Sequence, residues 1–247
     1  YLNWVEEYKK VNERPSLNAN IFSDVLLPVP PVDVQQKIIE GCRTFDAEYL
    51  KLYKQQQQDE QEIRQLFDEA QKKARYEYRL STESDFEIGI GKRVVQAELD
   101  EKGKMLVYSA NVYEPVGKIT REGILKHYNV PSVLWGIDGD WMVNFIEAKI
   151  PFYPTDHCGY IRVKNSQINP EYFSMVLEAE GLKVEFDRTN RASIERISAL
   201  LIKVPDISIQ DDVVAKCRKC KAELVMIKEK KKEVLLKKES VFDSYIK

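Results

Sequence analysis

The sequence predicts an α+β protein in which a mixed α/β domain is flanked by two long helices that form an antiparallel, coiled-coil-like pair. Nine of the ten glycines fall between residues 89 and 181, whereas residues 42–88 and 206–247 contain neither glycine nor proline. Breaker-free stretches of this length, rich in Glu, Lys, Gln and Leu, are typical of helices. The glycine-bearing block between them is typical of a compact domain.

The composition excludes several classes of protein. With 247 residues and 43% hydrophobic side chains, the chain can bury a core and is not disordered. The net charge of −2 gives no general basic field for nucleic acid, and no apolar stretch is long enough for a membrane span. Four cysteines are too few for a disulfide scaffold, so we expect a cytoplasmic protein. The chain begins at Tyr1, without a methionine, and we expect it to be part of a longer protein.

The first long helix is expected over residues 33–78. Prolines precede it, and Asp33 can cap its first turn. Its apolar residues recur three and four positions apart, and a polar segment, 55–62, interrupts them as a solvated section of helix. The second helix, over residues 206–247, begins after Pro205 and carries a similar apolar stripe. Since an isolated helix gains little stability in water, the simplest partner for each stripe is the other helix.

The chain repeats itself at a spacing of 175 residues. Residues 23–50 and 198–225 share nine identities in 28 ungapped positions, including polar residues of the helices. Each copy reads as a strand-like segment (22–27 and 197–204), a Val-Pro turn and a long helix. A repeat of this kind indicates a duplicated unit, here a globular domain followed by a helix. The predicted order is the tail of a first domain, a helix, a whole second domain and a helix.

The segments that open the two helices, "LLPVPPVDVQQKIIE" (26–40) and "LLIKVPDISIQDDVV" (200–214), resemble a hallmark of the specificity subunits of type I restriction–modification enzymes. Five further segments resemble the same family: "IGKRV" (90–94), "VYSANVYEPVGKI" (107–119), "LWGIDGDWMVN" (134–144), "FYPTDHCGYIRVK" (152–164) and "RTNRASIERI" (188–197). The resemblance covers essentially the whole chain. It implies the end of a first target recognition domain (1–32), a central conserved helix (33–78), a target recognition domain (79–205) and a C-terminal conserved helix (206–247).

The resemblance implies a DNA-recognition subunit without catalytic activity. Its recognition domain would read one half of a bipartite double-stranded DNA target in the major groove. The helices would dock methyltransferase subunits, which bring S-adenosylmethionine and the adenine chemistry, and a restriction subunit would join them. No cofactor is expected on the chain itself. Two alternatives stay open: a coiled-coil adaptor that binds protein, and the specificity region of a fused methyltransferase–recognition protein.

Several segments offer side chains suited to DNA. In "DRTNRAS" (187–193), arginine can fork onto guanine and asparagine can bind adenine, although the arginines could instead contact phosphates or nearby carboxylates. Asp138 can accept a hydrogen bond from cytosine or simply form an Asp-Gly turn. Lys92 and Arg93 suit a phosphate or base contact or a solvated turn, because "GIGKR" lacks the spacing of a phosphate-binding loop. The expected DNA-binding residues are Lys92, Arg93, Ser109, Asn111, Lys118, Asp138, Trp141, Thr155, His157, Arg188, Asn190, Arg191 and Ser193.

No catalytic or metal-binding residue is expected. A hydrolase built on Asp156, His157 and Cys158 lacks a supporting constellation, because adjacent residues rarely face one substrate. The Cys217-x-x-Cys220 pair lacks the second pair of ligands that zinc needs, so core packing is expected. The chain also lacks the Asn/Asp-Pro-Pro-Tyr/Phe motif that resembles the base-holding segment of adenine methyltransferases.

Overall fold

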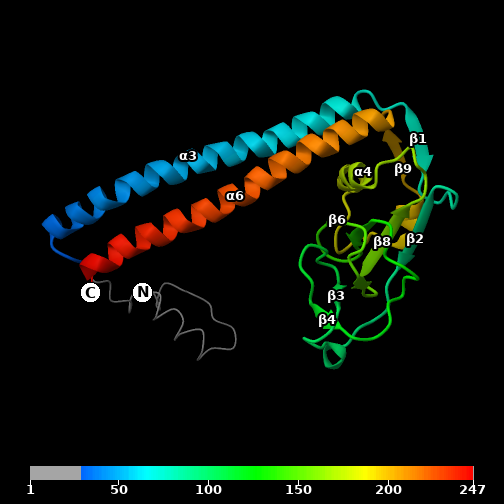
Figure 1. Cartoon of the computed structure of the whole chain (residues 1–247), viewed down its shortest axis with the longest axis horizontal. Helices are drawn as coiled ribbons and strands as arrows, with labels where there is room; N and C mark the ends of the chain where they lie inside the picture. The colour runs from blue at the N-terminus through cyan, green and yellow to red at the C-terminus, as the bar shows by residue number, and fades with distance from the viewer. Residues whose placement is uncertain (1–28, 247) are drawn as a thin grey trace. The chain divides into compact units, whose positions relative to one another are not determined.

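The computed structural model describes residues 29–246 (Figure 1). The described residues divide into two compact units, one formed by residues 29–58 and 224–246 and the other by residues 59–223. Helix α3 (Val32–Gln71) and helix α6 (Ile207–Ile246) each contribute to both units. We call these the helical unit and the recognition unit and describe each by itself.

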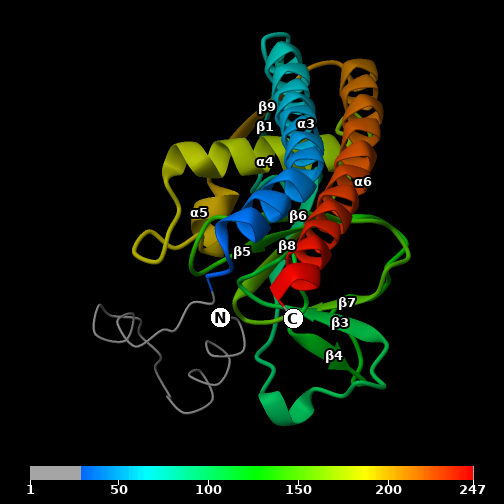
Figure 2. The same ribbon diagram turned by 90° about the vertical axis from the view of Figure 1, so that its left-hand side faces the viewer.

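The helical unit is an antiparallel pair made from the first part of α3 and the last part of α6, which lie side by side in Figures 1 and 2. Its core contains Leu52, Ile227 and Val234. Lys238 Nζ donates to Asp46 Oδ1 at 2.5 Å, and Lys231 Nζ donates to Gln56 Oε1 at 3.0 Å. As the residue number rises along α3, the residue number of the bonded partner on α6 falls. This order confirms the predicted antiparallel, coiled-coil-like pairing.

The recognition unit contains three sheets, two shorter α-helices and one 3₁₀ helix. Its strands are β1 (Tyr76–Arg79), β2 (Phe86–Ile90), β3 (Met105–Tyr108), β4 (Gly117–Ile119), β5 (Ser132–Gly136), β6 (Val143–Ile146), β7 (Phe152–Pro154), β8 (Cys158–Val163) and β9 (Leu201–Val204). Its helices are the short 3₁₀ helix η1 (Gln96–Glu98), α4 (Pro170–Val184) and α5 (Ile194–Ser198). The strand orders are β1-β9, β2-β8-β5-β6 and β4-β3-β7, and only the β3–β7 pairing is parallel. This arrangement confirms the predicted α+β class.

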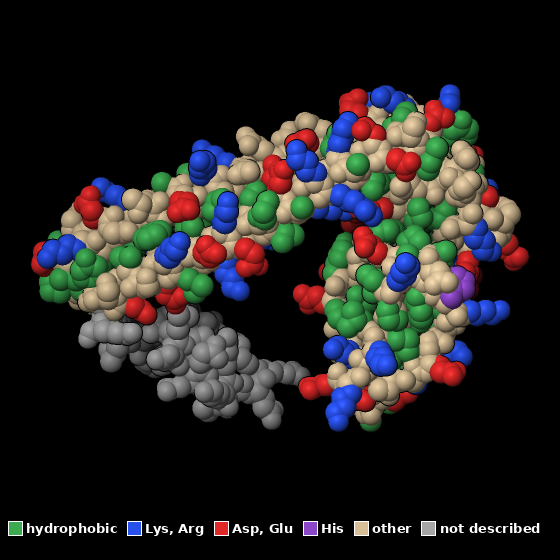
Figure 3. Space-filling view, in the orientation of Figure 1, with side chains coloured by type: hydrophobic (Ala, Val, Ile, Leu, Met, Phe, Trp, Pro, Cys, Tyr) green, Lys and Arg blue, Asp and Glu red, His purple; other side chains and the backbone are tan. Residues whose placement is uncertain are grey.

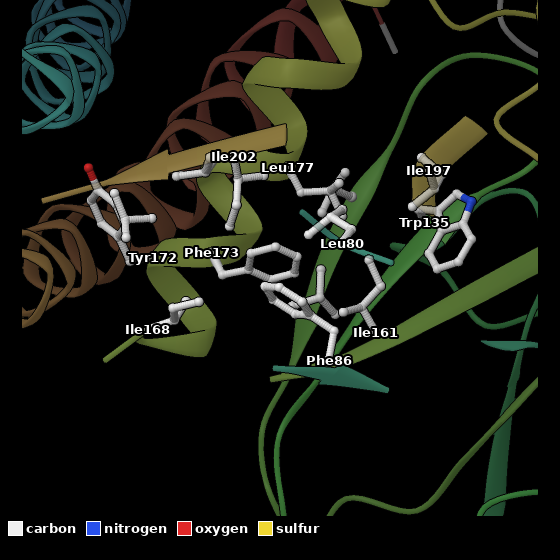
Figure 4. Close-up of a cluster of buried hydrophobic side chains, with 14 of the residues drawn as sticks. Leu80, Phe86, Trp135, Ile161, Ile168, Tyr172, Phe173, Leu177, Ile197 and Ile202 are labelled. Atoms are coloured by element: carbon white, nitrogen blue, oxygen red, sulfur yellow. The ribbon is translucent and has the colours of Figure 1, made fainter. Parts of the chain in front are cut away.

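The main core lies between the β2-β8-β5-β6 sheet and helix α4. Every residue of β5 is buried, and Val133, Leu134 and Trp135 at its centre are large and apolar. Figure 4 shows Phe86 and Ile161 from this sheet beside Phe173 of α4. Trp135 Nε1 donates to the Ala192 carbonyl at 2.9 Å, so the core also anchors the loop that precedes α5.

Helix α4 begins where the sequence supplies a cap. The Asn169 side chain accepts hydrogen bonds from the backbone N–H groups of Glu171 at 2.9 Å and Tyr172 at 3.1 Å. The helix ends at Glu185, which adopts a left-handed conformation with φ of 58°. The C-terminal end of α4 leads into the 187–193 loop.

Two predicted element boundaries are wrong. Helix α3 ends at Gln71 and not at residue 78, because Tyr76–Arg79 forms strand β1 against β9. The segment lacks glycine and proline, as a helix would, but its two tyrosines favour a strand and cross-strand pairing with β9 decides its conformation. The expected strand-like segment 197–204 is also shorter, since residue 197 belongs to α5 and only Leu201–Val204 is a strand. Its expected counterpart at 22–27 and the remnant domain 1–32 lie outside the described residues, apart from residues 29–32.

The repeat is visible where each long helix begins. The side-chain Nε2 of Gln35 donates to the Pro30 carbonyl at 2.8 Å, and the aligned Gln210 donates to the Pro205 carbonyl at 2.8 Å.

Within the described part of the chain, neither long helix has an apolar stretch of the length needed to cross a bilayer.

Candidate nucleic-acid interface

One pocket of the recognition unit brings together four of the expected DNA-binding residues. It has a volume of about 230 Å³ and is lined by Arg93, Val94, Val95, Gln96, Leu99, Ser109, Val116, Thr155, Asp156 and His157. Arg93, Ser109, Thr155 and His157 come from three different loops. The pocket combines a polar rim with apolar side chains, which is the mixture needed to contact base edges and thymine methyl groups.

A second pocket of about 660 Å³ shares Gln96, Leu99 and Val116 with the first. Lys118 on β4 lines this second pocket, together with Asp100 and Glu101. The shared residues make the two pockets neighbours on the surface of the recognition unit. A lysine beside such a groove is suited to a phosphate contact.

Hydrogen bonds hold the loops of the first pocket together. Thr155 is buried; its Oγ1 donates to Ser109 Oγ at 3.1 Å and accepts from the His157 backbone N–H at 3.2 Å. The Gly91 Cα lies so near β7 that an added Cβ would stand 1.8 Å from the Pro154 carbonyl oxygen. Only glycine therefore fits at position 91. Because both bonds of the Thr155 hydroxyl stay within the protein, Thr155 positions the β7–β8 loop.

Three of the expected residues form a second cluster, centred on Asp138 in the β5–β6 loop. Asp138 Oδ2 accepts a hydrogen bond from His157 Nδ1, and Asp138 Oδ1 pairs with Arg191 Nε. The side chains of His157 and Arg191 are 51% and 55% exposed, whereas that of Asp138 is 27% exposed. Partial burial raises the pKa of the Asp138 carboxyl, but the hydrogen bonds from His157 and Arg191 outweigh it and lower the pKa below its usual value.

Other expected contacts are engaged inside the recognition unit. Asn190 Nδ2 donates to the carbonyls of Val184 at 2.9 Å and Glu185 at 3.3 Å, and its Oδ1 accepts from Arg196. Ser193 Oγ caps α5 by accepting from the Arg196 backbone N–H at 3.4 Å. Both side chains therefore shape the loop that carries Arg191.

Asn111 and Trp141 are engaged in the same way. Asn111 Oδ1 accepts from the backbone N–H groups of Tyr113 at 3.0 Å and Glu114 at 3.3 Å, which closes a turn. Trp141 Nε1 donates to the Glu178 carbonyl at 2.9 Å, and its ring lies 5.0 Å from that of Phe186. The two remaining expected residues, Lys92 and Arg188, are exposed, as is Lys118.

The sequence reasoning missed Gln96 and Arg121. Gln96 is exposed at the start of η1 and lines both pockets. Arg121 Nη1 donates to Glu98 Oε1 at 2.5 Å, its Nη2 donates to the Arg93 carbonyl at 3.2 Å, and its guanidinium lies 4.4 Å from the Tyr153 ring centre. Arg121 thus holds the loop that carries Arg93 and Gln96. No motif or periodicity marks either residue, because their positions depend on contacts between separate loops.

The cysteines belong to the core. Burial raises the pKa of the Cys158 thiol well above its usual range. At neutral pH the thiol therefore stays protonated and does not form a thiolate nucleophile that His157 could activate. Burial also raises the pKa of Cys217 and Cys220. Among residues 29–246, no group of three or more His, Cys, Asp or Glu side chains is arranged to hold a metal ion.

Comparison with known proteins identifies the family. The model of the "Type I restriction modification DNA specificity domain" matches residues 85–237. No curated protein sequence matches the chain significantly.

Solved structures support the same fold. The S subunit of a type I restriction-modification system from M. genitalium has a TM-score of 0.58 and 15% identity, covering 87% of this chain and 61% of that one. A chain from a structure on complex assembly and conformational transition of the type I R-M system has a TM-score of 0.55 and 13% identity. The match covers 100% of the present chain and 67% of that one. The HsdS subunit from Thermoanaerobacter tengcongensis has a TM-score of 0.50 and 12% identity, covering 99% and 67%. The present chain thus spans 61% to 67% of the length of these relatives. Because the family model matches more than half of the sequence, the chain belongs to the type I restriction-modification DNA specificity domain family.

Proposed function

We propose that the recognition unit binds one half of a bipartite double-stranded DNA target in the major groove. The observation that carries this proposal is the convergence of polar side chains from separate loops: Arg93, Ser109 and His157 at one pocket, and Asp138 with Arg191 beside His157. Exposed Lys92, Lys118 and Arg188 supply further positive charge in the same unit. Phosphate contacts of this kind position a protein on the duplex, and base contacts select the sequence.

A binding experiment with the full chain tests this function. The chain is incubated with a pool of random duplexes, and the bound fraction is sequenced after several rounds of selection. We expect enrichment of a short motif and an affinity that falls as salt rises, because phosphate contacts release counterions. Absence of both enrichment and salt-dependent binding would favour the alternative function, a coiled-coil adaptor that binds protein.

The helical unit supports a proposal about partners. Many large apolar side chains are exposed on it: Ile39, Leu50, Tyr53, Val225, Met226, Leu235, Leu236, Phe242 and Tyr245. Figure 3 shows hydrophobic surface interspersed with charge along these helices. Apolar surface of this extent is suited to a protein partner. We infer that methyltransferase subunits dock here and bring S-adenosylmethionine, that a restriction subunit joins them, and that this chain contributes specificity without a catalytic step.

The repeat supports a proposal about domain organisation. On α6, Arg218 Nε donates to Glu171 Oε2 of α4 at 2.6 Å, and Val214 is only 7% exposed. Within residues 29–246, the aligned face of α3 lacks such a cover: Ile39 is 51% exposed, and Arg43 Nη1 lies 3.7 Å from Glu40 Oε1 of the same helix. We infer that this face of α3 receives a second recognition domain of the same class, whose C-terminal end is residues 1–32.

A further inference from the structure

The Asp138 carboxylate links two exposed side chains that come from different loops. One oxygen accepts from His157 Nδ1, after β7, and the other pairs with Arg191 Nε, before α5. His157 Nε2 lies 3.9 Å from Asp156 Oδ1, so a second carboxylate faces the far side of the ring. The backbone beneath each loop is also fixed, because Trp135 binds the Ala192 carbonyl at 2.9 Å and the His157 carbonyl accepts from the Ile137 N–H at 3.0 Å.

This arrangement has a specific consequence for the guanidinium of Arg191. Its Nε is engaged by Asp138, whereas no contact to its Nη1 or Nη2 is found within residues 29–246. The side chain is 55% exposed. An arginine held through Nε presents its two terminal amino groups as a planar fork, which is the geometry that binds the O6 and N7 atoms of guanine together.

We infer that Asp138 is a positioning residue for sequence recognition, which holds Arg191 through Nε so that its terminal amino groups are presented to a guanine. The inference rests on the proposed function and goes beyond it, because it assigns a base and separates the residue that reads from the residue that orients. His157 completes the arrangement by fixing the second oxygen of the same carboxylate. The lowered pKa of the Asp138 carboxyl keeps this residue ionised at neutral pH, as its positioning role requires.

Preorganisation sets the size of the expected effect. Without Asp138 the Arg191 side chain must lose rotamer freedom when it binds, which corresponds to a roughly three- to tenfold loss of preference for the cognate guanine. Without Arg191 the fork itself is lost, and the preference at that position should fall by about 10- to 100-fold.

The test uses the full chain and the duplex motif selected from the random pool. Dissociation constants are measured for that duplex and for duplexes in which each guanine is replaced in turn. We compare wild type with Asp138→Asn, Arg191→Ala and the double variant. Asp140→Asn is the matched control, because it removes the same charge from an exposed carboxylate in the same loop. Any general gain in affinity from losing a negative charge then appears in both variants and cancels.

We expect one guanine position at which Arg191→Ala removes the preference, Asp138→Asn weakens it three- to tenfold, and Asp140→Asn leaves it unchanged. In the Arg191→Ala background, Asp138→Asn should cause no further loss, because the two residues act as one unit. An unchanged preference in Asp138→Asn, or an equal loss in both backgrounds, would overturn the inference. If the wild-type chain selects no motif from the random pool, the proposed function itself is wrong. That result differs from a failure of the inference about Asp138, in which wild type selects a motif but the variants behave otherwise than expected.

A second variant covers the case in which Asp138→Asn does not fold, which its thermal melting curve would reveal. Arg191→Lys keeps the positive charge but removes both the Nε contact and the fork. We expect this variant to lose the guanine preference while it retains its affinity for random duplex. A retained preference would show that charge alone is sufficient and would overturn the role given to Asp138.

Discussion

The side-chain oxygen of Gln210 accepts a hydrogen bond from the backbone N–H of Asn169 at 2.9 Å, which joins the first turn of α6 to the residue that caps α4. Gln210 Nε2 donates to the carbonyls of Gln167 at 3.0 Å and Pro205 at 2.8 Å. Its side chain is completely buried and uses all of its amide groups. Through these bonds, a polar residue of the repeat joins the first turn of α6 to the segment before α4 within the recognition unit.

We therefore predict that Gln210→Ala lowers the free energy of unfolding by about 2–4 kcal/mol, because buried backbone groups lose their partners. The aligned Gln35→Ala is the matched comparison. Within residues 29–246, this variant removes one side-chain hydrogen bond, to the Pro30 carbonyl, from a half-buried position, so its cost should be about 0.5–1.5 kcal/mol. Chemical denaturation of both variants measures the difference, and equal losses would contradict this account.

Gly91→Ala should damage the first pocket. The added Cβ would stand 1.8 Å from the Pro154 carbonyl oxygen, which is backbone and cannot rotate away. We expect a loss of about 1–3 kcal/mol in stability together with weaker DNA binding. Denaturation and gel-shift measurements on the same preparation test both parts. Wild-type values in the two assays would show that the loop adapts without cost.

A buried carboxylate in α3 predicts a pH dependence of stability. Asp59 is 9% exposed, and its Oδ2 has no hydrogen-bond partner among residues 29–246. Burial, and then the nearby Glu223, raise the pKa of Asp59 in the folded protein. The charged form is therefore disfavoured by folding, so this carboxylate destabilises the protein at neutral pH. The penalty declines as the pH falls below the raised pKa and is gone below the ordinary pKa of the unfolded chain.

The corresponding substitution is Asp59→Leu. We expect it to raise the free energy of unfolding at pH 7 by about 1–3 kcal/mol, because it removes an unsatisfied buried group. The gain should shrink in acid, where the wild-type carboxyl is protonated. Asp68→Leu, at an exposed position of the same helix, is the control and should change stability little. A gain that stays constant from pH 7 to pH 4 would argue against titration of Asp59.

Lys118→Ala separates phosphate contacts from base contacts. If Lys118 binds a phosphate from the second pocket, its loss should weaken cognate and random duplexes alike and reduce the salt slope of log affinity by about one. Lys219→Ala removes the same charge from an exposed residue of α6 that lines neither pocket, and it should leave the slope unchanged. A loss confined to the cognate duplex would instead assign Lys118 to base recognition.

The proposed division of labour predicts that the chain alone has no catalytic activity. Incubated with S-adenosylmethionine, magnesium and its selected duplex, it should neither transfer methyl groups nor cut DNA. It should direct sequence-specific methylation once methyltransferase subunits and a first recognition domain are supplied. Methylation by the chain alone that is abolished by Asp138→Ala would contradict the proposal.

The sequence by itself determined the long helices, their pairing and the repeat. These features depend on local rules: the absence of glycine and proline, an apolar stripe at helical spacing, and identities at a constant offset. The same rules placed the end of α3 too late, because Tyr76–Arg79 is a strand only through its pairing with Leu201–Val204, which lies more than a hundred residues away in the sequence.

Only the tertiary structure decided which polar side chains face outward together. Asn190 and Ser193 have the same chemistry as base-reading residues, yet loop and helix-cap contacts use them. Asp138 lies 19 residues from His157 along the chain, and Arg191 is more distant still. They meet because β5 pairs with β8 and because Trp135 anchors the loop before α5. Sequence patterns record which groups are available, whereas sheet register and buried hydrogen bonds determine which of them converge.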